Sequence, residues 1–363
     1  MAERLERKLV LDDGNEYYGE GFGSSEDKLC ELIFDTSMVG TQELISDPAY
    51  LDKMVILTYP VAGSYGINDD DFCSRGASPA ALVVRKYNDD PSNFRCTATL
   101  AEYMEDNRIS GISGVDTREL TRKIREKGAC RAMLTNADTD REKALEAIRA
   151  YVPDERPAER ISCKKRWIAR PSRPSYSVAV IDLGLRSEAI KQLKLCGCNV
   201  TVLPFNVCAE QVRAIKPDGV YISAGPGNPE KLEETIALIN SLRGELTICG
   251  EGLGFQLICL ACGAKTFKLH HGIYGGSHPV RELASGKIAS CPQGRDFGVD
   301  AVSLADTSLK PTHEDVADGS LMGAEDKKTR CFGVQYISGG EGESYKTLFE
   351  RFVSSMKEAR ENA

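Results

Sequence analysis

The second half of the chain alternates between short apolar runs and segments with helical spacing. Apolar runs at 178–182, 199–204, 219–223 and 246–249 predict buried strands. Strands separated by helices of this length form βαβ units with parallel neighbours. We therefore predict an α/β domain with a doubly wound, mainly parallel sheet over residues 176–363. The helices predicted between and after these strands are 186–196, 209–215, 232–242 and 253–262.

The first half has a less regular pattern. Residues 7–20 alternate between apolar and polar positions around Asp12-Asp13-Gly14, which predicts a β-hairpin. Residues 116–127 have helical spacing, with Asp116 as N-cap and Gly128 as terminator. We predict a mixed α+β domain over residues 1–152. Its other predicted elements are strands at 30–36 and 54–58, a turn-rich segment at 59–78 and a helix at 99–107.

Residues 153–175 are rich in Pro, Arg, Lys and Ser and show no periodicity. This composition favours a linker that crosses between the two domains. A length of 363 residues is consistent with that division, because single cores rarely grow so large.

Composition narrows the functional classes. The chain is 41% hydrophobic and 28% charged, as in ordinary globular proteins, and its net charge is −8. This charge argues against nucleic acid or an anionic membrane as a partner. Residues 1–8 lack the apolar core of a signal peptide, and the apolar stretch at 246–264 is interrupted by polar residues. We therefore expect a cytoplasmic protein.

Thirteen cysteines are scattered along the chain, and we expect them to be reduced thiols. Cys259-x-x-Cys262 and Cys196-x-Cys198 have spacings that occur in metal sites, but the four histidines are not spaced to complete a zinc site. We predict no metal.

The most informative motif is Gly250-Glu-Gly252-Leu-Gly254, between a predicted strand and a predicted helix. In a nucleophile elbow, this sharp turn presents one reactive side chain beside main-chain N–H donors. Gly252 stands where the nucleophile belongs, and it has no side chain.

Long strings in both halves resemble the small, amidotransferase subunit of carbamoyl-phosphate synthase, and the resemblance covers nearly the whole chain. Those in the first half are 34–50, 57–60 and 114–128, and those in the second are 223–229, 250–254, 263–266, 275–280 and 312–313. The resemblance implies a class I glutaminase domain that releases ammonia from glutamine. It also implies a large-subunit partner that makes carbamoyl phosphate for pyrimidines and arginine. ATP and magnesium are then expected only in that large subunit, with no cofactor in this chain.

The resemblance also implies the positions of the catalytic triad. Glutamine hydrolysis needs a cysteine thiolate, a histidine base and a carboxylate that orients the histidine. The corresponding positions hold Gly252, Ile337 and Gly339. We therefore predict that glutaminase activity is absent, and that the chain is a scaffold or regulator of the large subunit.

The same resemblance implies that part of the family's glutamine pocket is retained in this chain. Five positions match family positions that hold substrate or supply oxyanion donors: Gly225, Gly227, Leu253, Gln256 and Phe297. Three depart from the pattern: Ala49 stands where a serine is usual, and Gly294 and Asp296 stand where an Asn and a Gly are expected. Glutamine or another small ligand could still bind there.

Two alternatives stay open. The first is an active glutaminase that uses displaced residues such as Cys249, although a cysteine in a buried strand is usually a core residue. Among other candidates, Ser223 and Ser277 lack an identifiable catalytic partner, and His278 and His313 match family positions outside the triad. The second alternative is a repurposed module that senses a small ligand in the old pocket.

Overall fold

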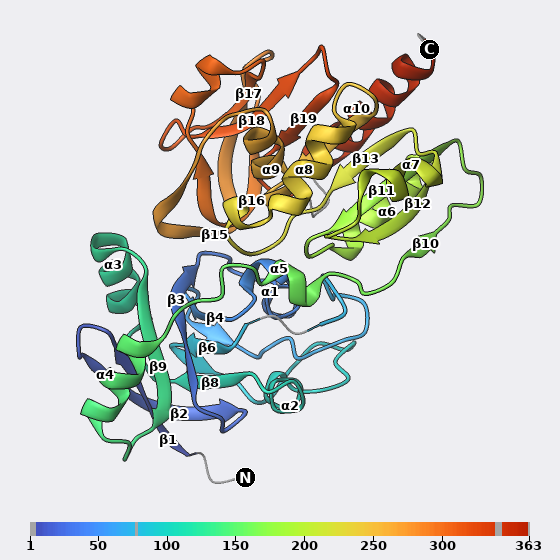
Figure 1. The fold of residues 1–363 in the computed structure, drawn as a ribbon. Helices are drawn as coiled ribbons and strands as arrows, with labels where there is room; N and C mark the ends of the chain where they lie inside the picture. The colour runs from blue at the N-terminus through green and yellow to red at the C-terminus, as the bar shows by residue number, and fades with distance from the viewer. Residues whose placement is uncertain (1–4, 77–78, 338–342, 362–363) are drawn as a thin grey trace. The chain divides into compact units, whose positions relative to one another are not determined.

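The computed structural model describes residues 5–76, 79–337 and 343–361. The chain forms two compact units (Figure 1). The N-terminal unit comprises Met1–Asp154 together with His270–Gly275, and the C-terminal unit comprises Glu155–Leu269 and Gly276–Ala363. Each unit has its own apolar core.

The N-terminal unit is built on a closed β-barrel. The predicted hairpin is confirmed, because β1 (Glu6–Leu11) pairs antiparallel with β2 (Glu16–Gly23). β1 also pairs with β9 (Cys130–Asn136), far along the chain, and this pairing closes the barrel. Alternate side chains such as Leu9, Leu11 and Leu134 fill the interior. The remaining strands around the barrel, from β2 to β9, are β8 (Ser110–Ser113), β6 (Ala81–Val84), β4 (Lys53–Leu57) and β3 (Lys28–Asp35).

Short helices surround these strands. The helices of this unit are α1 (Thr41–Ile45), α2 (Leu100–Asp106), α3 (Thr117–Lys127) and α4 (Arg141–Ala150), with a 3-10 turn, η1 (Pro48–Tyr50), after α1. The turn-rich segment at 59–78 contains β5 (Val61–Ala62), which pairs with β7 (Lys86–Tyr87).

Helix α3 begins and ends as its sequence predicts. The Asp116 carboxylate accepts the main-chain N–H groups of Arg118 and Glu119, each at 3.1 Å, which satisfies donors that a helix start leaves free. Gly128 ends the helix with a φ of 96°, where glycine is favoured. A segment from far along the chain packs here, because the N–H of Ala129 donates to the carbonyl of His270 at 2.9 Å.

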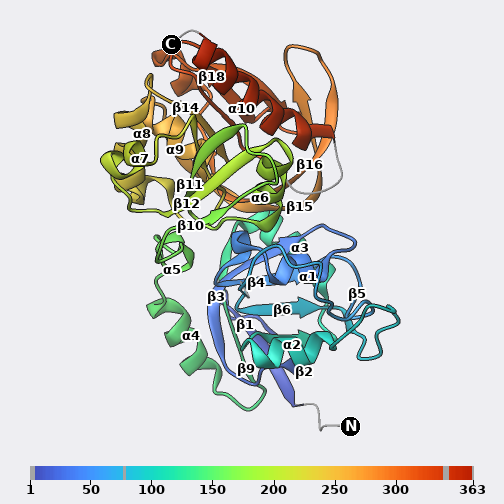
Figure 2. The same cartoon turned by 90° about the vertical axis from the view of Figure 1, so that its right-hand side faces the viewer.

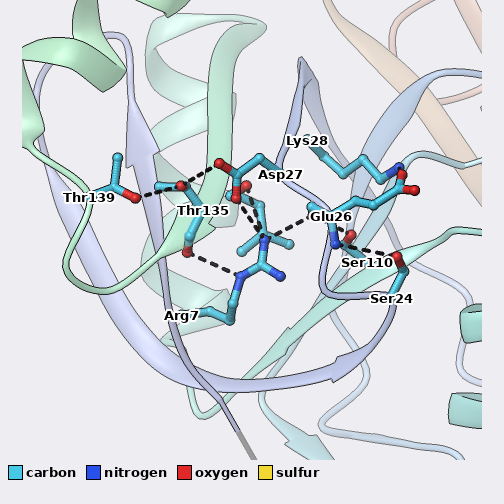
Figure 3. A network of polar contacts seen from close by, with 9 residues as sticks. Arg7, Ser24, Glu26, Asp27, Lys28, Ser110, Thr135 and Thr139 are labelled. Carbon is cyan, nitrogen blue, oxygen red and sulfur yellow. Dashed lines mark hydrogen bonds and ion pairs between the residues drawn. The ribbon is translucent and has the colours of Figure 1, made fainter.

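A buried arginine holds part of the barrel together (Figure 3). The Arg7 side chain is 1% exposed. Its guanidinium donates to the carbonyls of Thr135 (3.1 Å), Glu26 (2.9 Å) and Leu134 (3.3 Å), and lies 3.4 Å from the Asp27 carboxylate. Burial lowers the pKa of Arg7, and the charge of Asp27 opposes that shift. These contacts join β1 to β9 and to the segment before β3.

The C-terminal unit contains a ten-stranded sheet. Its parallel part contains the four predicted strands and β19, and β12, β11, β13, β14 and β19 lie side by side and parallel. Helices α7, α8 and α9 cover one face, and α6 and α10 cover the other (Figure 2). The strands are β11 (Tyr176–Asp182), β12 (Cys198–Pro204), β13 (Gly219–Ile222), β14 (Thr247–Glu251) and β19 (Cys331–Val334). The helices are α6 (Ser187–Leu195), α7 (Ala209–Ile215), α8 (Glu233–Leu242), α9 (Leu253–Ala261) and α10 (Glu343–Glu361).

Beyond β19 the sheet becomes antiparallel. β18 pairs antiparallel with β19 and β17, and β15 pairs antiparallel with β17. The elements of this extension are β15 (Thr266–Glu282), β16 (Ile288–Val299), β17 (Lys310–Asp315) and β18 (Leu321–Asp326), and the unit also has 3-10 turns η2 (Pro229–Lys231) and η3 (Val302–Asp306).

The segment at 153–175, which we expected to be a linker, also has structure of its own. It contains α5 (Ala158–Ile161), with Ala158 in the apolar core, and β10 (Trp167–Ala169). β10 pairs antiparallel with β12 at the edge of the sheet. A three-residue strand is held by main-chain hydrogen bonds and shows no periodicity in the sequence.

The cysteine pairs occupy ordinary positions in these elements. Cys259 lies in α9, Cys262 at its C-cap, Cys196 at the C-cap of α6, and Cys198 at the start of β12. All thirteen cysteines are free thiols. Among the residues that the structure describes, no group of three or more His, Cys, Asp or Glu side chains could hold a metal ion. No helix within these residues is long and apolar enough to cross a membrane.

Candidate functional site: a nucleophile elbow without a nucleophile

The predicted strand–turn–helix elbow is confirmed. β14 ends at Glu251, α9 begins at Leu253, and Gly252 between them has φ 55° and ψ −116°. A residue with a side chain adopts this conformation only under strain. The N–H of Gly252 donates to the carbonyl of Val334 at 2.9 Å, which ties the turn to β19.

Glycine at position 254 lets the elbow helix approach the sheet closely. A Cβ on Gly254 would lie 2.2 Å from the Ile222 carbonyl oxygen, which no real contact permits. A Cβ on Gly252 would instead lie 3.1 Å from the Ala224 Cβ, a tight contact that small movements relieve. The backbone therefore has the form of a nucleophile elbow, with room for a side chain that this sequence lacks.

Ile337 has no group that can carry a proton. Its side chain is 2% exposed, and its N–H donates to the carbonyl of Pro292 at 2.9 Å. It follows β19, the strand whose Val334 binds the elbow. Gly339, the third predicted triad position, lies outside the described residues.

Two of the predicted pocket residues contact each other. The Gln256 amide, 3% exposed, donates to the main-chain carbonyl of Phe297 at 2.9 Å. Leu253 packs in the apolar core between the sheet and its helices. Gly294 and Asp296 are half-buried on the same strand as Phe297, β16.

The remaining predicted pocket residues lie in turns. A Cβ on Gly225 would come within 1.9 Å of the Leu183 carbonyl oxygen, and Gly227 has a φ of 112°. Both positions therefore need glycine for the fold itself. Ala49 belongs to the N-terminal unit, where it is buried in η1 and its N–H donates to the Asp47 carboxylate at 3.0 Å.

Reasoning from the sequence missed two buried charged residues near these positions. Arg295 is 5% exposed, and its guanidinium donates to the Gln293 side chain at 3.0 Å and to the Phe297 carbonyl at 3.3 Å. Burial lowers the pKa of Arg295 to about 10. Arg295 and Gln256 thus share one acceptor. The sequence did contain a signal for this burial: Arg295 occupies an alternate position of its strand, on the same side as the buried Gln293.

The second missed residue is Glu251, which directly precedes the elbow. It is 2% exposed, and its carboxylate accepts a hydrogen bond from the Tyr221 hydroxyl. The sequence showed a carboxylate at the last position of an apolar strand, which was a signal for this residue. The negative charge of Glu251 raises the pKa of neighbouring thiols, because it disfavours a thiolate beside it.

The displaced candidates lack the surroundings of a catalytic group. Cys249 is fully buried, and burial followed by the charge of Glu251 raises the pKa of its thiol. The Ser223 hydroxyl accepts the N–H of Leu183 and donates to the Ala224 carbonyl. Cys249 and Ser223 therefore have the contacts of residues that stabilise the fold, and neither is set up as a nucleophile.

The two histidine positions outside the triad have different environments. His313 Nδ1 lies 2.9 Å from the Thr312 hydroxyl, and its ring packs edge-on against Tyr336. Burial lowers the pKa of His313, so the neutral imidazole is favoured. His278 is half-buried in β15, and the neighbouring Ser277 is exposed.

An elbow at the carboxyl end of a parallel strand, in a doubly wound sheet, occurs in several classes of hydrolase and in class I glutamine amidotransferases, and the comparison of sequences decides between them. Residues 179–336 match the family model for glutamine amidotransferase class-I, and residues 9–134 match that for the carbamoyl-phosphate synthase small chain, CPSase domain. The chain belongs to the family of carbamoyl phosphate synthase small chains.

Full-length relatives agree with this assignment. The carbamoyl phosphate synthase small chain of Fusobacterium nucleatum subsp. nucleatum is 39% identical, over 96% of this chain and 98% of its own length. The pyrimidine-specific small chain of Halalkalibacterium halodurans is 39% identical, over 99% of both chains. The small chain of Staphylococcus haemolyticus is 38% identical, over 99% of this chain and 98% of its own.

Proposed function

We propose that this chain is the small subunit of a carbamoyl phosphate synthase whose glutaminase is inactive. It acts as a non-catalytic scaffold or regulator of a large subunit that uses free ammonia. The main support for this proposal is that Gly252, which has no side chain, occupies an intact elbow. Ile337, at the position of the base, is a buried aliphatic residue. Loss of a nucleophile and its base lowers turnover by roughly a millionfold in the best-studied hydrolase triad.

The proposed partner follows from the family. A small chain implies a large subunit, and the match over residues 9–134 covers the domain peculiar to small chains. ATP and magnesium would bind to that large subunit. The product would serve pyrimidine or arginine synthesis, and the relative from Halalkalibacterium halodurans is named for the pyrimidine pathway.

The test is a nitrogen-source assay on the purified complex. The chain is co-purified with the large subunit of its own organism, and carbamoyl phosphate is measured with either glutamine or ammonium chloride. We expect ammonium chloride to support synthesis, and glutamine to support no more than the large subunit achieves alone. Synthesis from glutamine well above that control would refute the proposal.

An active glutaminase with a displaced nucleophile is the first alternative, and the surroundings of Cys249 argue against it. A buried thiol with a raised pKa is a poor nucleophile. Labelling with a glutamine-site electrophile and intact-mass analysis distinguishes the two functions. Selective modification of Cys249 would support this alternative, whereas labelling confined to exposed thiols such as Cys208 would support the inactive subunit.

A module that senses a small ligand in the old pocket is the second alternative, and two retained pocket residues favour it. The Gln256 amide and the Phe297 carbonyl, both at positions that match the family's glutamine pocket, are hydrogen-bonded at 2.9 Å. Thermal shift with glutamine, glutamate and ammonium chloride tests this function. A saturable rise in melting temperature with one of them would support sensing.

A further inference from the structure

The N-terminal unit carries an arginine-lined cavity that the proposed function does not use. It has a volume of about 720 Å³, and its lining includes Arg118, Arg122 and Arg125 of α3. The volume lies within the usual range for small-ligand sites, about 300–1,000 Å³. In a chain whose net charge is −8, this is a local concentration of positive charge.

All three arginines belong to α3, and their spacing along the helix places them on one face. With 3.6 residues and 5.4 Å per turn, Arg118, Arg122 and Arg125 fall within an arc of about 60° and along roughly 10 Å of helix. Their side chains can therefore reach one bound molecule together. A guanidinium presents a planar set of donors that matches the oxygens of a phosphate.

These guanidinium groups have few partners within the described part of the chain. Arg118 has no ion pair there, and Arg122 lies 3.9 Å from Glu126 in an exposed pair of little energetic weight. Arg125 lies over the ring of Phe34, 5.3 Å from its centroid, which restrains the side chain without using its N–H donors.

Apart from the Thr117 hydroxyl, the other polar side chains of the cavity are already engaged. Asp116 caps α3, and the Glu119 carboxylate accepts the Tyr17 hydroxyl at 2.9 Å. The hydroxyls of Thr36, Thr58 and Thr121 donate to main-chain carbonyls. The three guanidinium groups outnumber the two carboxylates of the lining, Asp116 and Glu119, so its net charge is 3 − 2 = +1 and the site favours an anion.

We propose that this cavity binds a small molecule with two or more phosphate groups, such as a nucleoside diphosphate or triphosphate. Because the three guanidinium groups are spread along roughly 10 Å of helix, linked phosphates match their spacing better than a single phosphate or carboxylate does. The proposal does not depend on the state of the glutaminase, because the cavity is lined by residues of the N-terminal unit.

The experiment is calorimetric titration of the full chain with pyrophosphate, a nucleoside triphosphate and citrate at constant ionic strength. We expect saturable binding of pyrophosphate and of the triphosphate, and weaker binding of citrate. R118Q/R122Q/R125Q should weaken pyrophosphate binding by at least about tenfold, since three charge-assisted contacts are removed. R118Q alone, which removes one exposed side chain, should weaken binding by about threefold or more.

The matched control is K164Q/K165Q/R166Q. It removes the same number of positive charges from exposed residues that line another cavity, of about 500 Å³, in the C-terminal unit. Pyrophosphate affinity should change by less than about twofold in this variant, because these exposed charges do not line the cavity and are screened by salt. Equal weakening in both triple variants would overturn the proposal, as would no binding of pyrophosphate or the triphosphate, or binding of citrate as tight as that of the phosphates.

Discussion

Replacing Gly252 with cysteine would put a nucleophile in the intact elbow, and we expect a folded chain that does not hydrolyse glutamine. The backbone at φ 55° and ψ −116° should cost a residue with a side chain about 1–3 kcal/mol. The new Cβ would lie 3.1 Å from the Ala224 Cβ, so neighbouring atoms must move slightly. A loss of this size leaves a typical domain folded.

The thiol would lack what activates it. Ile337 is buried and cannot accept a proton, and Glu251 places a carboxylate one residue away. Glu251 already contributes to the raised pKa of Cys249, and we expect it to raise the pKa of a thiol at position 252 as well. Turnover should therefore stay at background, roughly a millionfold below that of an intact triad.

The assay measures glutamate release by the variant in complex with the large subunit, and urea denaturation of the chain alone. Gly244→Cys is the matched control, because Gly244 also has a positive φ (87°) and a Cβ there meets nothing within 4 Å. Adding Ile337→His and Gly339→Glu to Gly252→Cys tests whether the pocket still binds glutamine. Normal turnover by Gly252→Cys alone would refute our account of Ile337.

Three further predictions concern stability. Arg7→Met removes the donor shared by three main-chain carbonyls and should destabilise the N-terminal unit by about 3 kcal/mol, measured by chemical denaturation with a barrel-specific probe. Gly225→Ala should cost more than about 3 kcal/mol, because its Cβ would lie 1.9 Å from a carbonyl oxygen, whereas Gly244→Ala should cost about 1 kcal/mol; equal losses in urea denaturation would contradict this. Burial lowers the pKa of His313, so the unfolded chain binds that proton more tightly and stability should fall as pH drops below about 6.5. His313→Gln should flatten this part of the curve, and an unchanged slope would show that His313 does not cause it.

Local features of the fold could be predicted from the sequence. The hairpin around Gly14, the caps of α3 and the βαβ order before α9 all depend on neighbouring residues, and all are confirmed. Closure of the barrel could not be predicted, because β1 pairs with β9 across more than a hundred residues. Local periodicity carries no information about such pairings.

The candidate site divides in the same way. The elbow was predictable because its glycines are close in sequence and have a steric reason, seen at Gly254. The shared acceptor of Gln256 and Arg295 was not, because it depends on how β16 passes the elbow helix. The sequence identifies charged residues such as Arg295, but it does not show that they are buried, because burial depends on tertiary packing.

The return of His270–Gly275 to the N-terminal unit has a consequence for how the chain is made. Packing of this segment beside Gly128 and Ala129 cannot form when residue 154 leaves the ribosome. About 120 more residues must be translated first, which takes roughly 6–24 s at typical rates of synthesis. The end of α3 stays uncovered during that interval. A fragment cut at residue 154 would keep it uncovered permanently, so the two units cannot be separated cleanly by a single cut.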